Sequence, residues 1–261
     1  MIIICTNKYD ESNKDKEIFL ERREFEFLFT GIFTDCGLKH FISERNVNCF
    51  YELLMYMSLT GPKINVTSIT DPVGIICRHF ADSVIIGEFI PQNASVVDIG
   101  TGGGFPSLPL AIVRPDLRVT AIDSTAKKIR YVEGASAASG AVNVTAVAGR
   151  AEEMCTGKMR ESFDAAVSRA VASMPVLCEL CIPFVKIGGD FIVMKGPAGD
   201  GELRASQTAI GKLGGEFTEK KEYILSTESE KITHSAFIIK KVSPTPLEYP
   251  RNFSQINKKT L

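Results

Sequence analysis

A cluster of glycines directly behind an acid is the feature of this chain best suited to bind a ligand. The apolar stretch 95–99 carries Asp98 and runs into Gly100, Gly102 and Gly104, after which a helical pattern begins. Glycine has no Cβ, so the backbone amides of such a loop can approach a ligand closely. The loop also opens onto the N-terminus of the predicted helix, where anionic groups bind well. These residues therefore predict a site for a nucleotide-type cofactor.

The third position of the glycine fingerprint indicates which cofactor that is. A dinucleotide site has the pattern Gly-x-Gly-x-x-Gly, whereas this chain places Phe105 where the last glycine would stand. A second acid, Asp123, ends a β-branched stretch about 20 residues further on, which is the spacing of a carboxylate that binds a ribose. Together, Asp98, the glycine loop and Asp123 resemble the S-adenosylmethionine (SAM) site of class I methyltransferases.

Composition and charge restrict the class of protein. The chain has 261 residues, of which 44% are hydrophobic, and its formal net charge is −1. That content suffices for one large or two small domains, and the charge argues against a protein that holds nucleic acid by overall electrostatics. The apolar run 1–5 is too short for a signal segment, and no stretch approaches the ~20 apolar residues of a membrane span. We therefore expect a cytoplasmic protein that does not bind a membrane.

The cysteines indicate neither disulfides nor a metal site. All seven lack the spacing of a disulfide framework, which favours reduced thiols. Cys178 and Cys181 form a C-x-x-C pair, but they lie in an apolar helical pattern with no second pair and no histidine nearby. We expect both to be small buried side chains and expect no bound metal.

The elements that must position these residues alternate between strand and helix. Strands are expected at 95–99, 118–123, 143–148, 165–169 and 190–195, with helices at 107–113, 126–138 and 175–185. Ser124 or Thr125 should cap the second helix, and Gly140 should end it. Such alternation predicts an α/β fold: a Rossmann-like, mostly parallel, doubly wound sheet with ligands at the carboxyl ends of its strands. The stretches 217–225 and 232–240 would add an antiparallel edge.

Flanking segments extend this core at both ends. Amphipathic patterns at 15–34 and 43–59 predict an N-terminal helical extension whose helices break at Gly31 and at Gly61-Pro62. Basic residues are frequent between 251 and 259. We therefore expect an N-terminal helical region over 1–92, a SAM-binding methyltransferase domain over 93–242 and a basic C-terminal tail over 243–261.

Ordered blocks of residues over more than half of the chain resemble the glucose-inhibited division protein B family (GidB, also called RsmG). These blocks are Ile64-Asn-Val-Thr67 with Asp71-Pro72, Arg78-His79-Phe-Ala-Asp82-Ser83, Asp98-Ile-Gly-Thr-Gly-Gly-Gly-Phe-Pro106, Leu108-Pro-Leu-Ala111, Asp123-Ser124 with Lys127-Lys-Ile-Arg130, Gly149-Arg-Ala-Glu-Glu153, 163–170 and Met194-Lys-Gly196. The family usually carries a Trp-Asn pair where this chain has Thr60-Gly61, and the first 30 or so residues match nothing in it. The resemblance implies a SAM-dependent methyltransferase that modifies guanine N7 in the decoding-centre loop of bacterial 16S rRNA.

The resemblance also implies roles for particular residues. Gly100 and Phe105 would line the SAM site, Ala151 and Glu152 would lie by the adenine, and Asp123 by the ribose. Arg169 would lie where the cofactor meets the target base. The complete set expected to bind the cofactor is Asp98, Gly100, Gly102, Gly104, Phe105, Asp123, Ser124, Ala151, Glu152 and Arg169.

Methylation of guanine N7 makes modest chemical demands on these residues. The nitrogen has an in-plane lone pair and no proton to remove, so catalysis is mainly alignment and needs no general base. Arg169 is the expected positioning residue, whether by stacking on a base, holding the cofactor carboxylate or binding a phosphate. Arg150, Lys195 and His79 are further candidates for the catalytic site. Lys195 would reach an RNA phosphate or extend along the sheet edge, and His79 would contact RNA or serve as a structural hydrogen-bonding residue.

Two other functions remain open at the level of the sequence. One is a non-catalytic rRNA-binding or assembly factor with a relic cofactor pocket, although the glycine loop, Asp123 and Arg169 are intact. The other is a nicotinamide-dependent oxidoreductase, against which Phe105 and the lack of a proton-relay set argue. The expected partner is 16S rRNA or the small ribosomal subunit, bound by a monomer.

Overall fold

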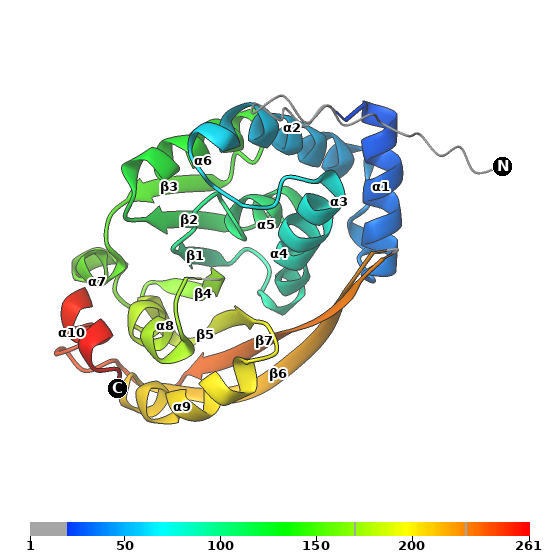
Figure 1. Ribbon diagram of the computed structural model, residues 1–261. Coiled ribbons are helices and arrows are strands. Elements are labelled where there is room, and N and C mark those ends of the chain that lie inside the picture. Colours follow the sequence, from blue (N-terminus) through cyan, green and yellow to red (C-terminus); the bar gives the residue numbers. More distant parts are fainter. Residues whose placement is uncertain (1–19, 170, 228) are drawn as a thin grey trace.

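The computed structural model describes residues 20–169, 171–227 and 229–261, and its centre is a seven-stranded sheet (Figure 1). The strand order is β3-β2-β1-β4-β5-β7-β6; neighbours among the first five pair in parallel, and β7 runs antiparallel to both β5 and β6. The strands are β1 (Ser95–Ile99), β2 (Arg118–Asp123), β3 (Val144–Ala148), β4 (Phe163–Arg169), β5 (Val185–Lys195), β6 (Gly215–Ser226) and β7 (Lys231–Lys241). The predicted fold class is confirmed. Strand order reverses between β1 and β4, which is where such sheets bind ligands.

Helices cover both faces of the sheet (Figure 1). The α-helices are α1 (Arg22–Asp35), α2 (Glu44–Thr60), α3 (Pro72–Gly74), α4 (Asp82–Ile85), α5 (Ser107–Val113), α6 (Ala126–Ser139), α7 (Ala151–Met154), α8 (Met174–Cys181), α9 (Gly199–Lys212) and α10 (Phe253–Lys258). A π-helix, η3 (Ile75–Ala81), joins α3 to α4, and short 3₁₀ turns are η1 (Lys39–Phe41), η2 (Gly61–Lys63), η4 (Ile86–Phe89), η5 (Gly157–Met159) and η6 (Ile182–Phe184). Among the residues described, no helix has both the length and the hydropathy needed to cross a bilayer.

Side chains along each strand point alternately to the two faces of the sheet, and an apolar core lies on each face. On β1, Val96 packs into a cluster with the N-terminal helices, whereas its neighbour Val97 packs with α8 and α9 on the opposite face. Successive strand residues point to opposite sides, so a run of apolar residues such as 95–99 supplies both cores. The N-terminal helices therefore share a core with the sheet. Cys178 and Cys181 are fully buried in α8, as predicted.

Three local expectations were wrong. Gly31 lies inside α1 and does not break it, because burial of Phe25, Phe29 and Phe33 outweighs the ~1 kcal/mol cost of a helical glycine. The predicted helix over 175–185 ends as an α-helix at Cys181 and passes through η6 into β5, because Pro183 cannot donate to the helical ladder.

The third concerns the start of α6. Thr125 stands at the N-cap, but neither its side chain nor that of Ser124 makes a capping hydrogen bond; instead, Thr125 N donates to Asp123 Oδ1 at 2.8 Å. Gly140 ends α6 in the left-handed conformation (φ 70°), as predicted. The N-terminal helix was expected from residue 15; residues 15–19 lie outside the described residues, and α1 begins at Arg22.

A buried ion pair attaches the C-terminal segment to the sheet layer. Glu179, on α8, has no exposed surface. Its Oε1 accepts from Arg251 N and Arg251 Nε, both at 2.8 Å, and its Oε2 accepts from Arg251 Nη2 at 2.6 Å. Ile256 on α10 is fully buried in the adjoining core. The segment around Arg251 is therefore a fixed part of the fold.

Replacing Arg251 should destabilise the protein. Arg251→Ala leaves the buried Glu179 carboxylate without its partner, and we expect the free energy of unfolding to fall by about 3 kcal/mol in urea titrations. The double variant Glu179→Met/Arg251→Met should regain most of that loss, because it removes both charges. Lys259→Ala, at an exposed position of the same segment, is the matched control. Equal stability of R251A and K259A would refute the structural role of the pair.

Candidate functional site

A cavity of about 550 Å³ opens where the carboxyl ends of β1 to β4 meet. Its volume is within the range of small-molecule sites. Of the predicted site residues, the following line it: His79, Gly100, Gly102, Phe105, Asp123, Ser124, Arg150, Ala151, Glu152 and Arg169. Asp98, Gly104 and Lys195 lie outside its wall. The parallel topology thus brings the strand-end residues of the sequence analysis together around one space.

The glycine loop forms the floor of this cavity. Gly100, Gly102 and Gly104 all have positive φ angles, of 75°, 59° and 88°. A Cβ on Gly100 would lie 2.5 Å from Val171 Cγ2, so a side chain there has no room. Gly102 lines the cavity, and a Cβ built on it would meet no protein atom closer than 3.8 Å. The space over Gly102 is therefore a cradle for a ligand, which fits the predicted cofactor.

Asp98 supports the loop from below. It is completely buried, and its Oδ2 accepts from Ser107 N at 3.2 Å, at the start of α5. Burial raises the pKa of Asp98 to about 6, although hydrogen bonds from Thr101 and Ser107 oppose the shift. Asp98 therefore positions the loop and does not line the cavity. Gly104 has a similar role, because a Cβ there would clash with Leu108 of α5.

Asp123 faces the cavity from the end of β2 while remaining 8% exposed. Its Oδ2 accepts from Gly102 N at 3.1 Å and lies 3.8 Å from Lys128 Nζ. Its Oδ1 accepts from Thr125 N at 2.8 Å. A carboxylate has about four lone-pair sites, so these contacts leave capacity for ligand hydroxyl groups. Asp123 thus links the loop, α6 and the cavity.

Arg169 is held at the end of β4 by a buried carboxylate. Its Nη1 donates to Asp82 Oδ2 at 2.9 Å and to Arg78 O at 2.8 Å, and its guanidinium lies 5.5 Å from the Phe105 ring centroid. Asp82 Oδ1 accepts from Tyr223 Oη at 2.9 Å and from His234 Nδ1 at 3.1 Å. Burial raises the pKa of Asp82, but the hydrogen bond from His234 and the charge of Arg169 outweigh it and hold the pKa below its usual value. Asp82 is therefore an anion.

The contacts of His79 determine its protonation state. Its ring stacks on Phe105, with centroids 4.7 Å apart and planes 15° apart. Nδ1 lies 3.2 Å from Arg169 Nη2, and Nε2 lies 2.6 Å from Thr67 Oγ1. Arginine can only donate, so Nδ1 accepts and the ring proton is on Nε2. Burial and the charge of Arg169 lower the pKa of His79 to about 3. It is a neutral, positioned ring at pH 7.

Phe253 is a cavity residue that the sequence pattern does not predict. It begins α10, lines the cavity and has its ring centroid 5.9 Å from Arg150 Cζ. Arg150 also lies beside Glu152, with Nη1 to Oε1 at 3.5 Å. A phenylalanine in a polar, basic tail carries no periodic signal that would place it at a site formed by residues 100–152.

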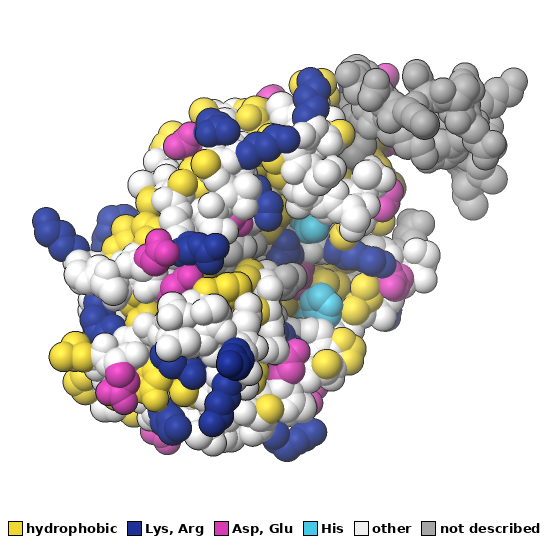
Figure 2. All heavy atoms as spheres, turned by 60° about the vertical axis from the view of Figure 1, so that its left-hand side comes forward, with side chains coloured by type: hydrophobic (Ala, Val, Ile, Leu, Met, Phe, Trp, Pro, Cys, Tyr) yellow, Lys and Arg dark blue, Asp and Glu magenta, His cyan; other side chains and the backbone are white. Residues whose placement is uncertain are grey.

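A second, smaller cavity of about 280 Å³ adjoins the first. The two share His79 and Arg169 in their walls, and the smaller one is otherwise lined by Arg78, Asp82, Met194, Lys195, Gly196 and His234. Lys195 forms an ion pair with Glu202 at 2.8 Å and donates to Ala172 O at 2.6 Å, so it is fixed at the sheet edge. Figure 2 shows histidine side chains at a hollow of the surface between Lys and Arg side chains.

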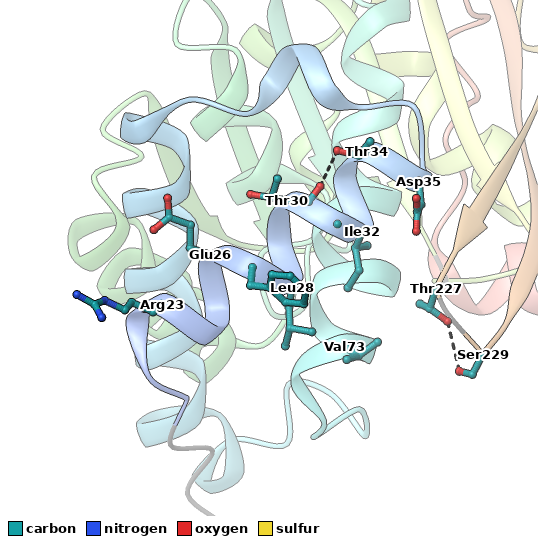
Figure 3. Close-up of a pocket in the computed structure, with 12 residues that line it drawn as sticks. Arg23, Glu26, Leu28, Thr30, Ile32, Thr34, Asp35, Val73, Thr227 and Ser229 are labelled. Carbon is teal, nitrogen blue, oxygen red and sulfur yellow. Dashed lines mark hydrogen bonds between the residues drawn. The ribbon is translucent and has the colours of Figure 1, made fainter. Parts of the chain in front are cut away.

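A larger hollow of about 930 Å³ lies elsewhere, along α1 (Figure 3). Leu28, Ile32 and Val73 give it an apolar wall, and Thr227 and Ser229 of the β6–β7 turn close one side. None of the predicted site residues lines it. Size alone therefore does not identify the functional site; the chemistry of the lining does.

Comparison with known structures identifies the fold. The crystal structure of M. jannaschii TYW2 in complex with AdoMet (SAM) aligns with a TM-score of 0.52 and 15% identity, covering 69% of this chain and 81% of that one. The shared architecture, with the glycine loop and the acid that ends β2, is the class I SAM-dependent methyltransferase fold.

Sequence comparison identifies the family. A family model described as rRNA small subunit methyltransferase G matches residues 45–229. Ribosomal RNA small subunit methyltransferase G of Clostridium beijerinckii is 40% identical over 227 residues, covering 86% of this chain and 93% of the relative. The protein of that name in Deinococcus deserti is 39% identical over 215 residues, covering 81% and 87%. This chain belongs to the rRNA small subunit methyltransferase G (GidB) family, and the prediction of family and cofactor is confirmed.

Removing the Asp123 carboxylate should weaken SAM binding. Asp123→Ala deletes an acceptor for the ligand and also frees Gly102 N, so we expect a loss of about 1–3 kcal/mol in binding free energy by calorimetry. Glu133→Ala, at an exposed position of α6, is the control. Wild-type affinity in a folded D123A protein would exclude Asp123 from the site.

His79 should make stability depend on pH. The folded state keeps His79 neutral down to a pKa of about 3, whereas the unfolded chain takes up the proton near pH 6.5. Stability from this group is thus complete above pH 6.5 and is lost as the pH falls from 6.5 towards 3, at up to about 1.4 kcal/mol per pH unit. Urea titrations of His79→Gln should show a correspondingly shallower decline. His40→Gln, on the surface, is the comparison; identical slopes for wild type and H79Q would contradict the assignment.

Proposed function

We propose that this chain transfers the methyl group of SAM to N7 of a guanine in the decoding-centre loop of 16S rRNA, within the small ribosomal subunit. The observation that carries the proposal is the pair of adjoining cavities whose common wall is formed by His79 and Arg169. Methyl transfer needs two ligands in contact at one point. The larger cavity, with the glycine loop and Asp123, suits the cofactor, so the smaller one suits the acceptor base.

In this reaction, the main task of the protein's residues is to position the cofactor and the acceptor base. SAM supplies a methyl group made electrophilic by its sulfonium. Guanine N7 accepts that methyl through its lone pair while the carbon–sulfur bond breaks, so positive charge passes to the base and no proton is removed. Arg169, neutralised by Asp82, aligns the two partners without adding a net positive charge at the junction. His79 is neutral and holds Arg169 and Phe105 in place.

The expected contact of each residue with the cofactor is inferred from its position in the cavity wall. Gly100, Gly102 and Phe105 would contact the ligand near the loop, Asp123 and Ser124 would bind the ribose hydroxyls, and the residues after β3, namely Arg150, Ala151 and Glu152, would lie by the adenine. Asp98 and Gly104 would act through the loop they support. Lys195 is our weakest candidate for the catalytic site, because its ammonium group is already paired with Glu202.

Other properties of the enzyme remain predictions that the chemistry supports. The residues described contain no group of three His, Cys, Asp or Glu side chains arranged to hold a metal, and N7 methylation requires none. We propose a monomer that acts in the cytoplasm, where the small subunit is assembled. We also propose that residues 93–242 carry the chemistry, while 1–92 and 243–261 frame the site.

Both alternative functions are less well supported. An assembly factor with a relic pocket would not need to keep Gly102 free of side chain and Asp123 bonded to the loop. A nicotinamide oxidoreductase would need a proton relay, whereas His79 is locked in a neutral form and Phe105 occupies the third fingerprint position.

The decisive experiment is transfer of labelled methyl from SAM to small ribosomal subunits taken from a strain that lacks the endogenous enzyme. We expect a single 7-methylguanosine in the decoding-centre loop, mapped by mass spectrometry. Label at another position would overturn the proposed acceptor. No label at all, with SAM binding intact, would favour the assembly factor.

Arg169 should matter far more for turnover than for folding. Arg169→Lys keeps one positive charge but cannot contact Asp82, Arg78 and His79 together, so the two ligands lose alignment and we expect about a 100-fold fall in methyl transfer. Arg118→Lys, at an exposed position at the start of β2, should be unaffected. If R169K lost stability in proportion to activity, Arg169 would have a structural role only.

A further inference from the structure

The C-terminal segment contributes a side chain to the cofactor cavity. Phe253 lies beyond every other lining residue in the sequence, and its side chain remains 37% exposed. Most other large aromatic side chains of the described chain are buried in the two cores. An aromatic ring with an open face on a ligand cavity is available to stack on a planar group.

Several contacts fix the position of Phe253. Two residues earlier, Arg251 forms the buried pair with Glu179, and three residues later, Ile256 is fully buried. Asn252 caps α10 by accepting from Gln255 N at 3.0 Å. In Figure 1, α10 lies beside α7 and α8, and α7 is the helix that follows β3. The ring is therefore held at the rim of the cavity and does not depend on a ligand for its place.

Strand order indicates which part of the cofactor faces this ring. Arg169, at the end of β4, marks the side where the smaller cavity joins, so the reactive methyl group belongs there. Asp123, at the end of β2, is the ribose position. The remaining side of the cavity, after β3, holds Arg150, Ala151 and Phe253. The adenine is the part of SAM left for that side.

We propose that Phe253 stacks on the adenine ring of SAM and closes that side of the cavity, with the Arg150 guanidinium beside it. Arg150 Cζ lies 5.9 Å from the Phe253 centroid, and the apolar side chains of Ile122 and Leu180 line the same cavity. The proposal rests on SAM being the cofactor. It gives the C-terminal segment a role in cofactor affinity that is separate from any contact of its basic residues with RNA.

The absence of tryptophan from the sequence allows a direct test. Phe253→Trp introduces a single tryptophan at the proposed stacking position. Titration of this variant with SAM, and with 5′-methylthioadenosine, which lacks the amino-acid part, should quench its fluorescence with both ligands. Phe27→Trp, at an exposed position of α1, is the matched reporter and should not respond. If the fluorescence of F253W did not change while calorimetry reported bound ligand, the proposal would be overturned.

Affinity provides an independent readout. Phe253→Ala should weaken binding of SAM and 5′-methylthioadenosine by the same factor of about ten, because the stack between the base and an aromatic ring is lost, and its urea midpoint should match wild type. Phe253→Tyr should keep wild-type affinity. Unchanged affinity in F253A would refute the stacking role and leave the methyltransferase assignment untouched. Failure of the wild-type protein to bind SAM would refute the assignment itself.

Discussion

The site depends on the ion pair and hydrogen bonds made by the buried carboxylate of Asp82. Asp82 is only 3% exposed. A charge buried to this extent is stable only when hydrogen-bonding or oppositely charged groups lie close to it in suitable geometry. Those partners come from three strands: Arg169 from β4, Tyr223 from β6 and His234 from β7. Asp82 itself begins α4 in the N-terminal region. One carboxylate therefore connects the helical extension, the parallel sheet and its antiparallel edge, and it fixes the guanidinium between the two cavities.

The same arrangement suits methyl transfer from SAM, because in that reaction a positive charge passes from the sulfonium to the acceptor base. The sulfonium of SAM and the methylated guanine are both cations, so an unpaired arginine beside them would be unfavourable. Asp82 offsets the charge of Arg169, while His79 stays neutral because of burial and that same arginine. The site can thus use arginine for its planar, directional donors and not for its charge. Precise alignment is the main contribution the protein has to make.

Segments far apart in sequence complete the cavity that the sheet begins. Where the smaller cavity joins, η3 and α4 supply His79 and Asp82; on the side after β3, the segment from Arg251 to Ile256 supplies Phe253. Each is attached by a buried ion pair, Asp82 with Arg169 and Glu179 with Arg251. In this way, the flanking segments enclose the space at the carboxyl ends of the strands. The sheet thus supplies the floor of the site, and the flanking segments supply parts of its walls.

The sheet, the glycine loop and the strand-end positions of Asp123 and Arg169 could all be predicted from the amino-acid sequence. These follow from local periodicity and from the rule that parallel strands meet at one edge. Three other features are visible only in the folded molecule: the burial of Asp82, the place of Phe253 at the cavity and the ion pair of Lys195 with Glu202. Their roles depend on which residues of distant elements lie opposite, such as His234 across the β6–β7 register or Glu179 beneath Arg251. Local pattern carries no information on such pairings, because they arise from packing between elements that are separated along the chain.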